Sequence, residues 1–141
     1  MNNAFKFAGT AAVIGGLLAG AGPVLAHHSA AMFDFTKTVT LTGTVAEVRW
    51  TNPHVTLLVD AKTEGGDQST NWLIEMTSPS NLVRVSNWTR TSVKPGDNVK
   101  LVVAPLRESD NKGGLLRTLT LIDTGQSFSP NIYQRSEPGL D

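Results

Sequence analysis

Residues 39–50 read VTLTGTVAEVRW, and the spacing of apolar residues in this stretch decides the fold class. Apolar or small residues occupy the odd positions from Val39 to Val45. After Val45 they occupy the even positions, up to Trp50. Alternation with a period of two is typical of a β-strand, and a change of phase indicates a bulge or a sharp bend. Gly43 favours a bend because it has no side chain. The stretch therefore predicts one long, bent strand.

The residues that follow predict four more strands and one short helix. The alternating stretches are residues 55–59, 72–76, 99–103 and 115–122. Ser78-Pro79 is typical of a helix start, and we expect a helix over residues 79–86 that buries Leu82 and Val85. Asn87 is expected to end it in the left-handed conformation. The order β-β-β-α-β-β is that of the OB-fold. The sequence thus predicts an all-β protein with one short helix, a five-stranded OB-like barrel; an open sandwich is the alternative.

The N-terminus has the pattern of a secretory signal peptide. Lys6 is followed by 15 mostly apolar or small residues, and Val24 and Ala26 occupy the positions that signal peptidase reads. A membrane anchor is the alternative, but the apolar run is shorter than the roughly 20 residues that span a bilayer. We therefore expect residues 1–26 to be removed, which gives a periplasmic protein without a membrane segment.

Composition restricts the partners of the remaining 115 residues, the size of one domain. Removal of Lys6 leaves 11 basic against 12 acidic residues, a balance that argues against a nucleic-acid partner. The chain has no cysteine, so stability must come from core packing or a ligand. We expect an N-terminal arm over residues 27–36, the barrel over 37–123, and a mobile tail over 124–141, which is poor in apolar residues.

Several short motifs also resemble a family of exported proteobacterial proteins known only as a domain of unknown function. The resemblance covers about residues 27–123 and is carried by His27-His28-Ser29, Met32-Phe33-Asp34, residues 39–45, Trp50-Thr51-Asn52-Pro53-His54, Trp72, Glu75, Ser78-Pro79, Leu82, Arg84, Trp88, residues 94–97 and Pro105. It implies export and a small barrel, but no catalytic residue and no ligand. Asn87 stands where the family pattern has Gly, and the tail after Asp123 is longer than usual.

The mature chain has three histidines, and two of them follow the predicted cleavage site directly. Cleavage after Ala26 gives His27 a free α-amine, which can chelate a metal ion together with its own imidazole. His28 lies next to it, and His54 can supply a further nitrogen. Nitrogen-rich tetragonal sites favour Cu(II), and the amine, with a reference pKa of about 7.7–8.0, is easily deprotonated for binding. We therefore expect a copper ion as the cofactor.

Strand pairing predicts a partner for His54. If the apolar residues of 55–59 and 72–76 share the core, one antiparallel register places Val55 opposite Ile74 and His54 opposite Glu75. Directly opposed residues have Cβ atoms about 4.5–5.5 Å apart. Glu75 is then a metal ligand beside His54, or it orients the imidazole. Asp34 is a further candidate ligand, with a turn residue as the alternative.

These residues predict a periplasmic protein that binds or delivers a metal, most simply copper, through His27, His28, His54 and Glu75. We expect binding rather than catalysis, because no Gly-x-Ser-x-Gly elbow, cysteine nucleophile or phosphate loop is present. In the alternative interpretation the histidines are polar residues beside a cleavage site, and His54 with Glu75 is a surface pair. The protein is then a metal-free OB-type module for a peptide, a glycan or an unidentified periplasmic partner protein.

Overall fold

A computed structural model of the 141-residue chain describes residues 30–108, 110 and 112–130. The predicted signal peptide, residues 1–26, lies outside this part. The elements in chain order are η1 (Ala30–Met32), β1 (Val39–Arg49), β2 (Thr56–Thr63), β3 (Thr70–Glu75), α1 (Pro79–Ser86), β4 (Asn98–Pro105), β5 (Gly113–Leu121) and β6 (Ser127–Phe128). In the described part of the chain, no helix is long and apolar enough to cross a membrane.

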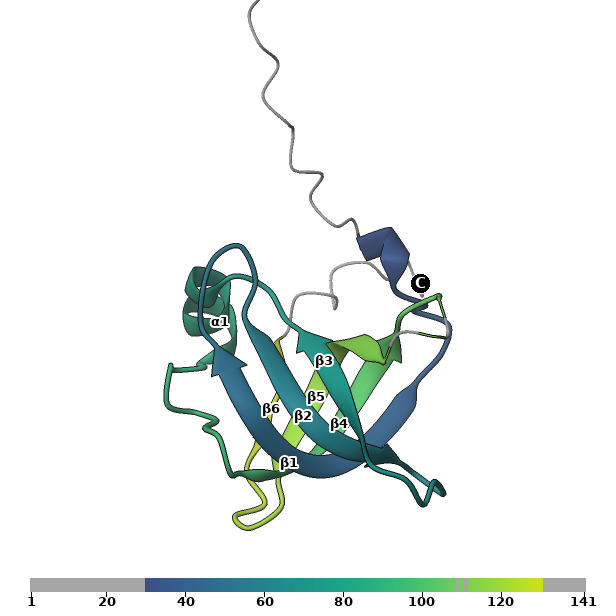
Figure 1. The fold of residues 1–141 in the computed structure, drawn as a ribbon. Helices are drawn as coiled ribbons and strands as arrows, with labels where there is room; N and C mark the ends of the chain where they lie inside the picture. Colours follow the sequence, from purple (N-terminus) through teal and green to yellow (C-terminus); the bar gives the residue numbers. More distant parts are fainter. Residues whose placement is uncertain (1–29, 109, 111, 131–141) are drawn as a thin grey trace, which may run out of the picture.

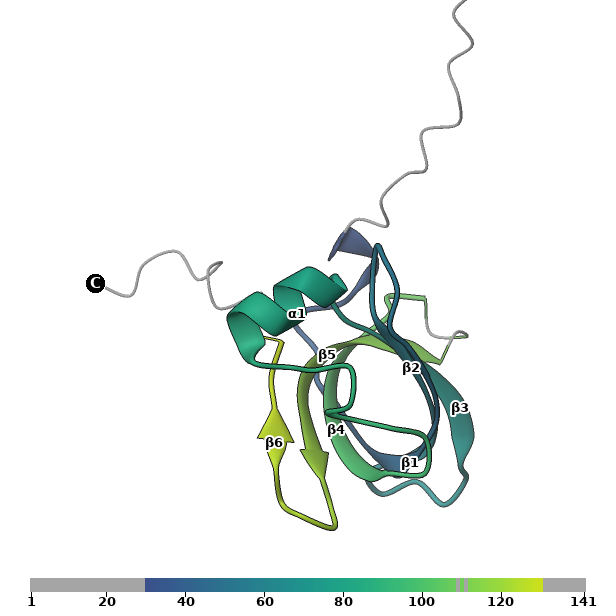
Figure 2. The same cartoon turned by 90° about the vertical axis from the view of Figure 1, so that its left-hand side faces the viewer.

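Five of the strands close into a barrel (Figure 1). The long strand β1 pairs antiparallel with β2 on one side and with β4 on the other, β2 pairs with β3, and β4 pairs with β5. A parallel pairing of β3 with β5 completes the ring, and β6 lies against β5 outside it (Figure 2). The predicted OB-like barrel is confirmed.

The bend predicted in β1 is a β-bulge. The register of β1 against β2 shifts between Val45 and Glu47, where the apolar phase changes. The Val45 N–H donates to the carbonyl of Asp97 and the Val45 carbonyl accepts from the N–H of Gly96, at 2.9 and 2.8 Å. The turn before β4 therefore holds the bulge. A Cβ on Gly43 would collide with the Asp60 carbonyl oxygen, so glycine permits close approach of β1 and β2.

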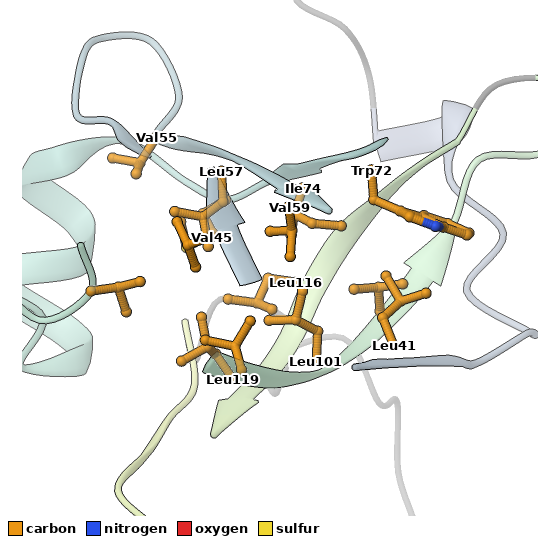
Figure 3. Close-up of a cluster of buried hydrophobic side chains, with 14 of the residues drawn as sticks. Leu41, Val45, Val55, Leu57, Val59, Trp72, Ile74, Leu101, Leu116 and Leu119 are labelled. Carbon is orange, nitrogen blue, oxygen red and sulfur yellow. The ribbon is translucent and has the colours of Figure 1, made fainter. Parts of the chain in front are cut away.

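The barrel interior is apolar and contains side chains from β1 to β5 (Figure 3). The predicted inward face of β2 and β3 is confirmed, since Leu57, Ile74 and Trp72 are at most 6% exposed. The side chains labelled in Figure 3 are Leu41, Val45, Val55, Leu57, Val59, Trp72, Ile74, Leu101, Leu116 and Leu119. Burial of these residues is the main source of stability in a chain without cysteines.

Helix α1 matches its predicted bounds but not its predicted burial. Ser78 caps the N-terminus by accepting from the Asn81 N–H, and Asn87 ends the helix in the left-handed region at φ 55°. Leu82 is fully buried, whereas Val85 is 56% exposed, so the prediction that Val85 is buried was wrong. Leu82 is the single fully buried residue of this eight-residue helix, so a short helix here buries a narrower apolar face than the sequence pattern predicted.

Residues 124–130, at the start of the predicted mobile tail, belong to the folded domain in the structure. Residues Ser127–Phe128 form β6, and the rings of Phe128 and Trp88 pack with their centroids 5.0 Å apart. The Trp88 indole N–H donates to the Ser129 carbonyl at 3.4 Å, and Pro130 is buried. The few apolar residues of the segment are sufficient to hold it because they meet a large buried ring. Residues 131–141 lie outside the described residues.

Candidate functional site

His54 and Glu75 are in side-chain contact on the surface of the barrel. His54 lies in the loop between β1 and β2, directly after the cis peptide bond of Asn52-Pro53, and Glu75 is the last residue of β3. The distance from His54 Nδ1 to Glu75 Oε1 is 2.6 Å. The side chains are 33% and 19% exposed, so both groups are partly shielded and still accessible to a ligand from solvent.

The predicted contact between these residues occurs, but the predicted register was wrong. In the structure Glu75 is opposite Thr56 and Ile74 is opposite Leu57, a shift of two residues that keeps the same side chains in the core. The predicted register would place Met76 opposite Pro53, which has no N–H to donate. In the observed register, the Met76 N–H donates to the Val55 carbonyl, and the Val55 N–H donates to the Thr77 carbonyl. His54 therefore reaches Glu75 diagonally, a spacing that long side chains can bridge.

The geometry gives the two residues different chemical roles. A carboxylate on Nδ1 selects the imidazole tautomer and orients the ring, as carboxylates do behind metal-bound histidines. Within the described residues, no hydrogen bond occupies His54 Nε2, so this nitrogen is available for an ion. Of the two roles expected for Glu75, the contact favours orientation of His54 over direct ligation.

The N-terminal arm is attached to the barrel beside Glu75, which the sequence did not predict. Phe33 is 3% exposed and packs with Leu115 in a second apolar cluster outside the barrel interior. Leu115 and Glu75 are register partners on β5 and β3, so their backbones are about 5 Å apart. Main-chain hydrogen bonds join Asp34 to Pro105 and Arg107 to Met32, at 2.8 and 2.9 Å. The adjacent large apolar residues Met32-Phe33, in an arm without a clear period, are the sequence signal for this anchor.

The other candidate ligands are not brought together in the part of the chain that the structure describes. His27 and His28 lie outside it, and no group of three or more metal-ligating side chains occurs within residues 30–108, 110 and 112–130. Asp34 has the alternative role of a turn residue, since its carboxylate accepts from the Thr36 backbone N–H and hydroxyl. The Thr36 hydroxyl in particular lowers the pKa of the Asp34 carboxyl below its ordinary value.

The tryptophans do not form one stacking surface. Trp72 and Trp88 are buried at 6% and 1% exposure, in agreement with a role in the core. Trp50 is half-buried at the end of the first strand.

Comparison with known proteins gives a family and no function. A family model described as a family of unknown function (DUF6152) matches residues 13–116. No curated protein and no solved structure matches the chain.

Proposed function

The chain belongs to the DUF6152 family, whose function is unknown, and we propose that it is a periplasmic protein that binds or delivers a metal ion, copper in particular. The proposed ligands are the α-amine and imidazole of His27, the imidazole of His28 and Nε2 of His54. Glu75 fixes the orientation of His54. The observation that carries the proposal is the 2.6 Å contact between His54 Nδ1 and Glu75 Oε1.

The position of the arm supports the participation of the two N-terminal histidines. Phe33 anchors the arm on Leu115, which is the strand neighbour of Glu75. His27 lies three positions before Ala30, the first described residue, and three extended residues span about 10 Å. Little chain therefore separates the mature N-terminus from the surface that carries His54.

The donor set determines the preferred metal. One amine and up to three imidazoles are nitrogen donors of intermediate softness, which favour Cu(II) over Mg²⁺ or Ca²⁺. Zn²⁺ and Ni²⁺ are the nearest competitors for such ligands. Because the ligands belong to a barrel loop and to a short anchored arm, the site suits reversible binding and delivery better than catalysis.

Titration of Cu(II) into the purified mature protein, against a competing chelator, tests the proposal. We expect each protein molecule to bind one Cu(II) ion tightly. The electron paramagnetic resonance spectrum of this ion should show couplings to nitrogen. A chain that lacks His27 and His28 and the variant His54→Asn should each bind more weakly. Equal copper affinity in all three proteins would overturn the proposal.

The role of Glu75 has its own test and a matched control. Glu75→Gln should weaken copper binding about 10–100-fold, the usual cost of removing a carboxylate that orients a metal-bound histidine. Glu64→Gln removes an exposed carboxylate in the loop between β2 and β3 and should leave the affinity unchanged. Equal effects of the two substitutions would indicate a nonspecific electrostatic contribution.

The mature N-terminus is the precondition of the site. The intact mass of protein recovered from the periplasm should correspond to a chain that begins at His27. A chain that begins at Met32, after cleavage at Ala31, would have lost both N-terminal histidines and would exclude the proposed chelate.

The second candidate function is a metal-free binding module, and an apolar pair on the outer face of the sheet favours it. Leu58 and Leu73 are register partners on the outer face of β2 and β3, and Leu73 is 47% exposed. If copper does not bind, a periplasmic pull-down should recover a partner that the variant Leu73→Asp no longer captures. Recovery of the same proteins by both chains would argue against this face as the binding surface.

A further inference from the structure

A groove separate from His54 is lined by residues from the end of β1 and from the segment that joins α1 to β4. Its volume is about 590 Å³. Apolar groups from Val48, Trp50 and Val93 form part of its wall. The remaining lining residues are Glu47, Arg49, Thr51, Arg90, Thr91, Lys94 and Pro95. We refer to this feature as the Trp50 groove.

The Trp50 groove has one cation that no carboxylate neutralises within the described chain. Arg49 is paired with Glu47 at 2.7 Å, and Lys94 is paired with Asp97 at 3.0 Å. Arg90 is exposed, and among the described residues its guanidinium donates to the Trp50 carbonyl alone, at 3.5 Å. The groove thus combines an aromatic wall with an available positive charge, which suits a peptide that carries apolar and acidic side chains.

The C-terminal end of the described chain lies close to this groove. The Ser86 hydroxyl, in the last turn of α1, donates to the Pro130 carbonyl at 2.7 Å. The Trp88 indole donates to the Ser129 carbonyl, and Trp88 precedes Arg90 by two residues. The chain therefore leaves the fold beside the segment that forms one wall of the groove.

We propose that residues 131–141 of this same chain occupy the Trp50 groove. The 11 residues, NIYQRSEPGLD, reach at most about 36 Å when extended, more than twice the length of α1. They carry Tyr133 and Leu140 for the apolar wall. Glu137 and Asp141 provide carboxylates for Arg90, against a single basic residue, Arg135.

Covalent attachment explains why the segment is preferred over a free ligand. A segment on a short linker has an effective concentration of the order of millimolar at its site. One arginine–carboxylate contact and one aromatic contact then suffice for occupancy, although the same peptide would bind weakly when free. The groove is thus a peptide-binding site that the protein's own C-terminal residues fill.

The experiment follows the indole N–H signal of Trp50 by NMR, with the signal assigned from Trp50→Phe. Truncation after Pro130 should shift this signal, and addition of a synthetic peptide of residues 131–141 should return it toward the full-length position. In the full-length protein, Arg90→Glu should produce the same shift. The control Lys100→Glu reverses an exposed charge on β4, and it should leave the Trp50 signal unchanged.

A second set of variants leaves the described part of the chain untouched. Glu137→Lys with Asp141→Lys should release the segment as truncation does, and Arg90→Glu added to this pair should restore the full-length signal. Identical Trp50 signals in the full-length and truncated chains would overturn the proposal. A signal that depends on protein concentration would also overturn it, because the segment would then come from a second copy.

Discussion

Replacement of Phe128 by alanine tests whether β6 is an integral part of the domain. The ring of Phe128 packs on Trp88, and both side chains belong to the core or border it. Deletion of a fully buried phenylalanine costs about 3–5 kcal/mol, and an aromatic pair contributes about 0.5–1.5 kcal/mol beyond its area. Phe128 is only half-buried, so we expect a loss of about 2 kcal/mol.

Urea denaturation followed by tryptophan fluorescence measures this loss as a lower midpoint with an unchanged slope. For a domain of this size, the same loss lowers Tm by roughly 8–16 °C. The control is Ile122→Ala, because Ile122 is 49% exposed; its effect should stay within about 0.5 kcal/mol. A loss below about 0.5 kcal/mol for Phe128→Ala would refute the inclusion of β6 in the cooperative fold.

Three further substitutions test other local arguments. Gly43→Ala should destabilise the protein by about 1–3 kcal/mol in denaturation experiments, because the added Cβ would lie 2.6 Å from the Ala61 Cα. Asn87→Ala should cost about 1 kcal/mol through its left-handed backbone, whereas Asn87→Gly should leave the melting temperature nearly unchanged. The folded-state pKa of Asp34 is lowered, chiefly by the Thr36 hydroxyl, so its carboxylate stabilises the fold above the ordinary aspartate pKa. Asp34→Asn should therefore be less stable than the unsubstituted protein at pH 7, and melting curves of the two should converge as the pH falls below about 4.

The sequence by itself determined the fold class and the order of the elements. The phase change in residues 39–50 predicted the bulge between Val45 and Glu47, because alternation with a period of two records which side chains face the core. Ser78 and Asn87 predicted the ends of α1, since capping depends on residues within one turn of the helix. These signals are local, so no knowledge of distant contacts was needed.

The sequence also identified His54 and Glu75 as neighbours, but for an inexact reason. Two registers that differ by two residues bury the same faces of β2 and β3, so periodicity cannot distinguish them. The structure selects the register in which Met76 pairs with Val55 instead of with the proline. The resulting diagonal contact still joins the imidazole to the carboxylate.

Only the tertiary structure decided the positions of the two ends of the described chain. Phe33 and Phe128 each stand in a segment without periodicity, and each packs against residues far away in sequence. The anchor of the arm beside Glu75 and the exit of the chain beside the Trp50 groove depend on these contacts. Barrel closure brings β3 next to β5, and the end of α1 contacts the segment after β6. Such proximity between residues far apart in sequence leaves no mark on local sequence patterns.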